Sequence, residues 1–416
     1  MVKPGYKQTE IGVIPENWEV GAIGSVCTSV AVGGNYQNSA TPSDYPLIKM
    51  GNLSRGNITL EKVEYIKATI PDQKDLLHYG DVLFNTRNTP ELVGKVAIWR
   101  NELPRAYYNS NLLRFVFDTE KADPFYMNLA LNTEKTVSAF RNIAKGTTSV
   151  AAIYPQDLLK VIIPIPPLAE QQRIAEALSD MDELIASLEK LIAKKKAIKQ
   201  GAMQELLTGK RRLPGFSGEW PSKKLKDCTE RIIVGLATSV TQYYREEGIP
   251  IFRNLNILPN RLDESDVLYL DPSFAKLYSN KQVKEDDVLT VHTGYVGTSC
   301  LVPKNHAGSL TFTTLITTVK KDLLSPQYLA FHLNSDSGTK MIEALQAGGG
   351  RNNLNVSDFE QYELTFPQDM DEQVAIANIL EDLDKEIGCI EQKHKKSIEI
   401  KQGMVQQLLT GKIRLV

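Results

Sequence analysis

Residues 198–213 read IKQGAMQELLTGKRRL, and residues 400–415 read IKQGMVQQLLTGKIRL. The second stretch repeats the first without a gap. The offset of 202 residues also carries Glu170 to Glu372 (372 − 170 = 202), and each is followed by a glutamine. Self-similarity at a fixed period indicates that a whole structural unit has been repeated. The sequence therefore predicts two similar halves, each with a variable block of about 150 residues and a repeated segment of about 45.

The repeated segments have a helical pattern. Their apolar residues recur at alternating steps of four and three: Ile174, Leu178, Met181, Ile185, Leu188 and Ile192, then Ile376, Leu380, Leu383, Ile387 and Ile390, with His394 in the same phase. This is the seam by which two helices pair in a coiled coil. Prolines precede each segment and Gly209 and Gly411 follow it, as at helix ends. We predict two helices of about 40 residues, each roughly 60 Å long, that pair with each other. An amphipathic helix packed on its own domain is the alternative.

Composition sets further limits. A chain of 416 residues exceeds the size of a single core, so at least two domains are expected. The formal net charge is −2, so binding to nucleic acid would require local basic patches. We find no apolar run of membrane-spanning length and no secretory signal, and we expect no contact with a membrane. The four cysteines form no CxxC pair, which favours a reducing cytoplasm and gives no disulfide framework or structural zinc site.

The variable blocks have short β runs and turns. Candidate strands are YPLIKM, DVLFNT, KVAIW and LLRFVF in the first block and IPIFRN, DVLTVH, SCLVP and TLITTV in the second. Helical stretches follow in both, DPFYMNLALN and SPQYLAFHLN. The order of elements is shared while the loop residues differ. This is what we expect of a protein that recognises two different things on one duplicated scaffold.

The sequence contains no recognisable catalytic motif. Both TGK sequences fail the phosphate-binding P-loop pattern, because Gln204 and Gln406 replace its first glycine. No methyltransferase motif is recognisable, and PDQKD at 71–75 is better explained as a surface turn than as a nuclease motif. The five histidines show no ligand spacing. We therefore predict no catalytic residues, no cofactor and no metal.

Five stretches carry a resemblance to a known family. They are YKQTEIGVIPENWEV at 6–20, IPIPPLAEQQRIAEALSDMDELI at 163–185, LLTGKRRLPGFSGEW at 206–220, FPQDMDEQVAIANILEDLDKEI at 366–387 and LLTGKIRL at 408–415. Together they resemble the specificity subunits of type I restriction-modification systems over essentially the whole chain. The second helix opening lacks one proline of the first, and His394 replaces an aliphatic seam residue. These departures put only local helix entry and packing in doubt.

The resemblance implies an α+β protein with an internal pseudo-twofold repeat. Two mixed α/β target-recognition domains would be separated by two long antiparallel helices forming a coiled coil. The boundaries would be 1–165 and 213–367 for the recognition domains, and 166–212 and 368–416 for the helices. Each domain would read one half of a bipartite, asymmetric site in double-stranded DNA. The implied partners are methylation subunits, numbering two, which carry the S-adenosylmethionine chemistry, and restriction subunits, which carry ATP-driven translocation and cleavage. Because an internal repeat offers two similar patches, the repeated LLTGK ends and the faces of the coil are expected to dock the methylation subunits. Stabilisation of the coil core is the alternative role of these residues.

Base and phosphate recognition favours Arg, Lys, Asn, Gln and Thr in loops beside strand ends. In the first block the candidates are Lys49, Asn52, Arg55, Asn85, Thr86, Arg87, Asn88, Lys95, Arg141, Lys145, Thr147 and Thr148. In the second block they are Arg253, Asn254, Asn256, His292, Thr293, Tyr295, Arg351, Asn352 and Asn353. Ordinary turns use the same residue types, so an architectural role is the alternative for each of them.

Three functions remain open from the sequence. The first is a non-enzymatic DNA-specificity subunit, the second a two-headed scaffold that binds proteins, and the third a nuclease or methyltransferase with unrecognised motifs. Salt-dependent, sequence-selective DNA binding separates the first from the second. Failure of the purified chain to cleave or methylate DNA separates the first from the third.

Overall fold

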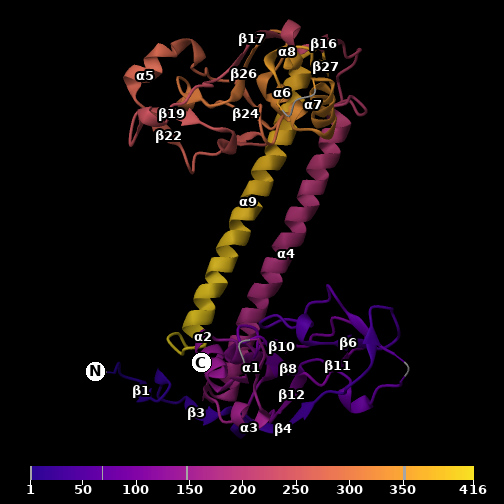
Figure 1. The fold of residues 1–416 in the computed structure, drawn as a ribbon, viewed down its shortest axis with the longest axis vertical. Helices are drawn as coiled ribbons and strands as arrows, with labels where there is room; N and C mark the ends of the chain where they lie inside the picture. Colours follow the sequence, from indigo (N-terminus) through magenta and orange to yellow (C-terminus); the bar gives the residue numbers. More distant parts are fainter. Residues whose placement is uncertain (1, 68, 147–148, 350–352) are drawn as a thin grey trace. The chain divides into compact units, whose positions relative to one another are not determined.

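The computed structural model describes residues 2–67, 69–146, 149–349 and 353–416. The chain divides into two compact units, one of Met1–Ser187 with His394–Val416 and the other of Leu188–Lys393. Two helices of 39 residues, α4 (Leu168–Leu206) and α9 (Met370–Leu408), each contribute residues to both units (Figure 1). The prediction of two long helices is confirmed.

The first unit contains two four-stranded sheets. The antiparallel sheet has the order β10-β8-β12-β4, with β4 Cys27–Val32, β8 Val82–Asn85, β10 Val96–Ile98 and β12 Leu112–Phe117. The mixed sheet has the order β11-β6-β7-β5, with β5 Asn38–Ser39, β6 Pro46–Ile48, β7 Glu64–Ile66 and β11 Tyr107–Tyr108. Strand β8 is buried on both faces, as its apolar run VLF predicts.

The second unit repeats this topology. Its antiparallel sheet has the order β24-β23-β26-β17, with β17 Thr229–Val234, β23 Val288–Val291, β24 Ser299–Leu301 and β26 Thr314–Val319. Its mixed sheet has the order β25-β19-β22-β18, with β18 Tyr244–Arg245, β19 Ile249–Phe252, β22 Leu268–Leu270 and β25 Leu310–Thr311. The shared order of elements predicted from the two variable blocks is thus confirmed at the level of strand pairing.

Three helices recur in both units after the sheets. They are α1 (Pro124–Leu131), α2 (Glu134–Ile143) and α3 (Pro155–Leu158), then α6 (Pro326–Leu333), α7 (Asp336–Gly349) and α8 (Val356–Phe359). The side chains of Asp123 and Ser325 cap α1 and α6 by accepting a backbone N–H, and a proline occupies the first helical position of each. These are the preferred residues at helix starts, which explains why the sequence shows both helices.

Shorter elements complete each unit. In the first unit a hairpin is formed by β1 (Tyr6–Thr9) and β2 (Gly12–Pro15). Strand β3 (Glu19–Ala22) pairs with β15 (Ile162–Ile165). A small sheet contains β9 (Arg87–Asn88), β14 (Ala151–Ala152) and β13 (Lys145–Gly146). In the second unit β16 (Ser222–Lys224) pairs with β27 (Glu363–Thr365), β20 (Ile257–Leu258) pairs with β21 (Arg261–Leu262), and α5 (Pro272–Leu277) follows β22.

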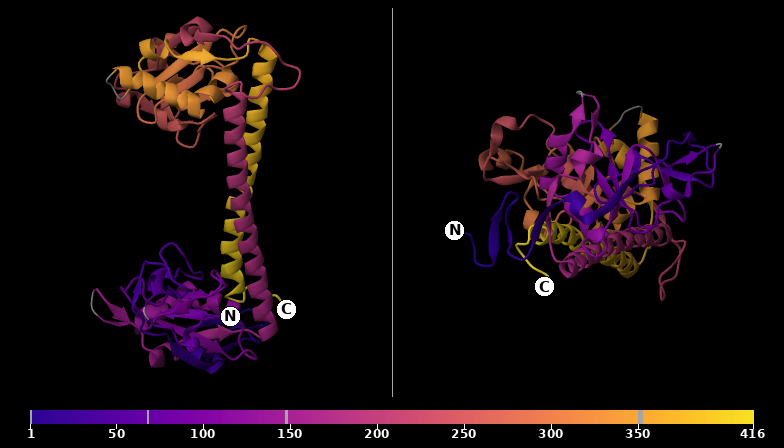
Figure 2. Two further views of the ribbon diagram at one scale, coloured as in Figure 1. Left: turned by 90° about the vertical axis from the view of Figure 1, so that its right-hand side faces the viewer. Right: turned by 90° about the horizontal axis from the view of Figure 1, so that it is seen from below.

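Within each unit α4 and α9 lie side by side and run in opposite directions (Figure 2). In the first unit Asp182 of α4 pairs with Lys401 of α9, and in the second Lys199 of α4 pairs with Asp384 of α9. The seam residue Ile174 is buried in the core of the first unit, and Ile376 in the core of the second. The antiparallel pairing implied by the resemblance is confirmed, and packing on the domain accompanies it at the helix ends.

Among the described residues no helix is long and apolar enough to cross a membrane. The four cysteines are free thiols. In the same part of the chain, no group of three or more His, Cys, Asp or Glu side chains is arranged to hold a metal ion.

Candidate nucleic-acid interface

A short turn that follows β6 in the first unit and β19 in the second has the same geometry in both units. Leu53 bridges Ile58 in the first unit, and Ile257 pairs with Leu262 in the second. Each turn needs one residue with positive φ, which is Gly56 at 92° and Asn260 at 58°. The turns therefore correspond in structure although their sequences, SRGN and LPNR, differ.

Asn52 and Asn256 hold these two turns in place. Each is at most 3% exposed, and each side-chain oxygen accepts the backbone N–H three residues earlier, from Lys49 or Arg253, at 2.9 Å. Each amide group donates to two carbonyls further along its turn. Both predicted residues thus have their polar atoms engaged inside the fold.

The neighbouring predicted cations are paired with acids. The Lys49 ammonium lies 3.0 Å from Glu64 and 3.2 Å from the side-chain oxygen of Asn38. The Arg253 guanidinium lies 2.7 Å from Asp266. Both ion pairs are partly exposed, so the cations can exchange their partner for a ligand at modest cost.

The loop after β8 carries four predicted residues in different environments. Asn85 is fully buried and its amide donates to Leu92 at 3.5 Å. The Thr86 hydroxyl donates to the carbonyl of Asn111 at 2.8 Å, and Asn88 is half-buried. The Arg87 side chain is exposed, and no hydrogen bond or ion pair occupies it among the described residues. Arg87 is therefore the residue of this loop that is available to a ligand.

A second predicted loop lies beside the first. Strand β9, which carries Arg87, pairs with β14, and β14 pairs with β13, which begins at Lys145. The Ile153 N–H donates to the carbonyl of Thr86 at 2.9 Å. The structure thus brings together segments that are about 60 residues apart in sequence.

The same contact is rebuilt in the second unit with different side chains. The Leu354 N–H donates to the carbonyl of His292 at 3.0 Å, and Thr293 bridges Asn353. The Asn254 amide donates to the carbonyl of Thr293 at 2.9 Å. Three predicted segments of this unit therefore meet at one place.

Two side chains of this second cluster differ in exposure. Tyr295 is 90% exposed, an unusual position for an aromatic ring that lies in a loop of candidate recognition residues. His292 is half-buried, and its Nδ1 lies 3.0 Å from the carbonyl of Leu354.

Positive charge gathers around the first cluster. Arg55 is half-buried and donates to the carbonyl of Gly94 at 3.3 Å. Burial lowers the pKa of Arg55, and the charge of Arg141 lowers it further. Arg141 is exposed in the last turn of α2. Lys145 is exposed and pairs with Asp157 at 2.6 Å, and Lys95 is half-buried.

Four predicted residues, Thr147, Thr148, Arg351 and Asn352, lie outside the described residues.

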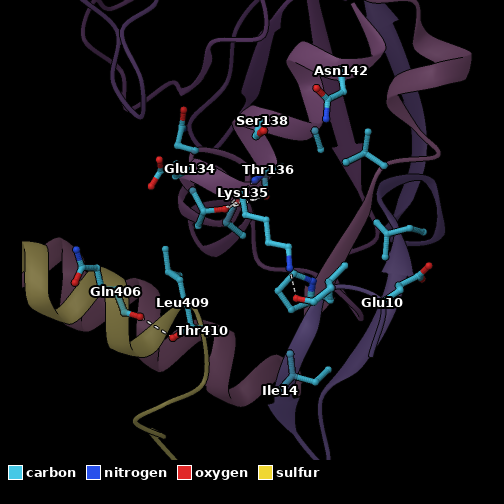
Figure 3. Close-up of a pocket in the computed structure, with 18 of the residues that line it drawn as sticks. Glu10, Ile14, Glu134, Lys135, Thr136, Ser138, Asn142, Gln406, Leu409 and Thr410 are labelled. Carbon is cyan, nitrogen blue, oxygen red and sulfur yellow. Dashed lines mark hydrogen bonds between the residues drawn. The ribbon is translucent and has the colours of Figure 1, made fainter. Parts of the chain in front are cut away.

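A separate groove of about 1350 Å³ opens in the first unit (Figure 3). The β1–β2 hairpin, α2 and the end of α9 line it, including Leu409, Thr410 and Lys412 of the repeated LLTGK sequence. Lys135 of α2 donates a hydrogen bond to the carbonyl of Ile11 in the hairpin. The groove thus places a predicted docking sequence beside an open, partly apolar surface.

Sequence reasoning missed a polar cluster that joins the two copies of the repeat. In the first unit Arg414 donates to both carboxylate oxygens of Glu170, at 2.6 and 2.7 Å, and the Trp18 indole N–H donates to the same carboxylate at 2.9 Å. In the second unit Arg212 donates twice to Glu372 at 2.6 Å. The 202-residue offset relates the members of the two clusters, but it does not indicate which of them pair.

The glutamine after each of these glutamates fastens a long helix to its domain. Gln171 accepts the backbone N–H of Asp123, the residue that caps α1, at 3.0 Å. Gln373 accepts the N–H of Ser325, the cap of α6, at 2.8 Å. The repeated Glu-Gln pair therefore serves architecture in both halves.

Comparison with known proteins gives this arrangement a family. The model of the type I restriction modification DNA specificity domain matches the chain twice, over residues 15–200 and 217–402. The chain belongs to this family.

Named relatives agree with this assignment. A putative type I restriction enzyme MjaX specificity subunit from Methanocaldococcus jannaschii is 29% identical over 433 residues, covering 99% of this chain and 97% of the relative. The EcoKI specificity subunit of Escherichia coli K12 is 23% identical, covering 97% and 90%. The type I restriction-modification S subunit from M. genitalium has the same fold, with a TM-score of 0.60 at 14% identity over 94% of this chain and 96% of that one.

Proposed function

We propose that this chain is a sequence-specific DNA-binding specificity subunit of a type I restriction-modification complex. In this proposal the recognition domains comprise residues 1–165 and 213–367, and each reads one half of a bipartite, asymmetric site. The segments 166–212 and 368–416 carry the long helices and set the spacing between the half-sites. Catalysis resides in partner subunits, and the complex acts on DNA in the cytoplasm.

One observation carries the proposal. The same backbone hydrogen bond joins two loops in both units. In the first unit the Ile153 N–H, just before α3, donates to the carbonyl of Thr86, just after β8. In the second the Leu354 N–H, just before α8, donates to the carbonyl of His292, just after β23. The side chains on it differ, with Arg87 exposed in one unit and Tyr295 in the other. A shared frame with different exposed groups is what two readers of different base sequences require.

The exposed members of the predicted set are the proposed DNA contacts. In the first domain these are Arg87, Arg141 and Lys145, and in the second they are Thr293 and Tyr295. Arginine suits guanine in the major groove, where its fork meets two acceptors. Asn52, Asn85 and Asn256 contribute by shaping the loops that carry such residues.

The proposed partners follow the same repeat. Methylation subunits dock on the LLTGK ends and on the faces of the coil, which the groove beside Leu409 and Thr410 supports. Two similar patches from an internal repeat fit two copies of one partner. Restriction subunits join the complete complex.

The proposal is tested by mapping methylated positions in DNA from cells that carry this chain with its methylation partner. We expect one bipartite sequence with a fixed spacer. Arg87→Ala should relax or weaken one half-site and leave the other unchanged. Unaltered affinity and specificity in this variant would remove Arg87 from the interface.

A protein-binding scaffold is the competing function. It predicts binding to DNA that is weak and independent of sequence, so the same measurement decides between them. A catalytic chain would cleave or methylate DNA without partners, which a purified preparation can show directly.

A further inference from the structure

Arg55 differs from most half-buried arginines of this chain in lacking an acidic partner. Arg114, Arg231 and Arg414 are 15–22% exposed, and each lies within 3.0 Å of a carboxylate. Arg55 donates only to the carbonyl of Gly94, and no carboxylate pairs with it among the described residues. A partly desolvated cation without a counterion is costly in the free protein.

A second cation increases this cost. Arg141 has no ion pair in the described part of the chain. It lies near Arg55, because Gly94, whose carbonyl accepts from Arg55, packs against Phe140, the residue before Arg141. Burial and, to a lesser extent, the charge of Arg141 both lower the pKa of Arg55. Two like charges that fold next to each other indicate a site that an anion completes.

The backbone beneath Arg55 is held firmly. The Gly56 N–H donates to the carbonyl of Val96 at 2.7 Å, and the Gly56 carbonyl accepts from the Asn128 amide at 3.0 Å and from Arg100 at 3.4 Å. Because the turn is held by these three bonds, its backbone needs no rearrangement when Arg55 binds a ligand.

Open space lies beside Arg141. A cavity of about 600 Å³ is bordered by Arg141, Gly146, Ala151 and the exposed carboxylate Glu91. Such a volume accommodates a phosphodiester group with room for solvent. Glu91 opposes an anion at the rim, so its charge should weaken binding.

We propose that Arg55 and Arg141 together bind one backbone phosphate of DNA in the first recognition domain. This inference rests on the proposed function and deepens it, because it assigns to these two residues positioning of the duplex rather than reading of bases. The guanidinium fork matches phosphate oxygens, and two such groups around one anion remove the repulsion between them.

The corresponding turn of the second unit has a different residue at this place. The turns pair at Leu53–Ile58 and at Ile257–Leu262, so Pro259 stands where Arg55 stands in the first. Proline carries no charge, and this position therefore supplies a phosphate contact to the first half-site alone.

The test measures binding of the full chain to a random-sequence DNA duplex between 50 and 200 mM salt. Each phosphate neutralised contributes about 0.9 to the slope of log affinity against log salt. For Arg55→Met with Arg141→Met we expect the slope to fall by about 0.9, so the fourfold rise in salt costs about 3.5-fold less affinity than in the wild type. Arg105→Met removes an exposed arginine that does not border the cavity, and should leave the slope unchanged. Glu91→Gln should raise the affinity.

Thermal unfolding of the free protein separates a binding role from a structural one. Arg55→Met should keep or raise the melting temperature, because it removes a repelled, desolvated charge. A clear fall would assign Arg55 to the fold and overturn the inference, as would an unchanged salt slope in the folded double variant. A fall of about 1.8 would indicate two separate phosphates and overturn the shared site. Absence of duplex binding by the wild type would instead refute the proposed function itself.

Discussion

Arg414 and Glu170 lie 244 residues apart in the chain and form a bidentate ion pair whose carboxylate is 3% exposed. Arg212 and Glu372 form the equivalent pair in the second unit. In both cases the glutamate at the start of one long helix binds the arginine that follows the end of the other. Each copy of the repeat thus completes the structure of its counterpart.

Removing this carboxylate charge should destabilise the first unit. Glu170→Gln leaves Arg414 without its counterion in a partly buried place, and loss of one partner of a buried pair costs about 3–5 kcal/mol. Urea unfolding followed by tryptophan fluorescence should show an earlier transition for the first unit. Glu205→Gln is the matched control, because Glu205 is 52% exposed and pairs with an exposed Arg211. Equal midpoints for Glu170→Gln and the wild type would contradict a stabilising role.

The first half of the chain should form a homodimer by itself. Every pair that joins the long helices joins a residue of one copy to a residue of the other, such as Asp182 to Lys401. The 202-residue repeat makes Lys199 the counterpart of Lys401, so two copies of residues 1–212 can form Asp182–Lys199 pairs in both directions. Sedimentation should show a dimer. Asp182→Lys should break it and a further Lys199→Asp should restore it, and a folded monomer at micromolar concentration would refute the idea.

Matched insertions in the helices should alter the spacer and leave the half-sites intact. The two units divide between Ser187 and Leu188 in α4 and between Lys393 and His394 in α9. Seven residues inserted at both points keep the apolar seam in phase and lengthen each helix by about 10 Å. The insertions fall at the boundary between the two units, so the contacts inside each unit are kept. Methylation mapping should return the same two half-sites at a changed separation. A heptad in α4 alone should disrupt pairing and assembly, and an unaltered spacer in the matched variant would reject a rigid spacer.

Acid should destabilise the second unit through His332. This side chain is buried on α6 with a hydrogen bond to the backbone of Leu207, and desolvation lowers its pKa to about 4. Because the folded pKa lies below the ordinary value of 6.5, the unfolded chain takes up the proton first. Stability is full above pH 6.5 and falls by about 3 kcal/mol toward pH 4. His332→Ala copies Ala130 of the first unit and should flatten this part of the pH profile, as measured by urea midpoints. An identical pH profile in the variant would contradict the prediction.

The long helices could be predicted because a seam of six apolar positions and flanking prolines and glycines are local signals. The order of strands within each sheet depends on contacts distant in sequence and was not predicted. The repeat predicted only that the two blocks share their order of elements. The partner of Glu170 could not be predicted, since nothing near it in sequence identifies an arginine in the other copy. Asn52 and Asn256 show another limit. An asparagine in a loop serves equally well to hold a turn or to bind adenine, and only burial tells the two apart.

Tyr6, near the start of the sequence, donates its hydroxyl to the carbonyl of Gly411, near its end, at 2.9 Å. Around the glycines of the segment that joins α4 to β16, Gly215 and Gly218, a side chain would meet open space. A rearranged gene that opened the chain there and joined the segment around Tyr6 to the segment around Gly411 would therefore keep both long helices and both recognition units. Gene rearrangements of this kind could exchange or reorder the two recognition domains. They would produce new target sequences while the paired long helices stay the same.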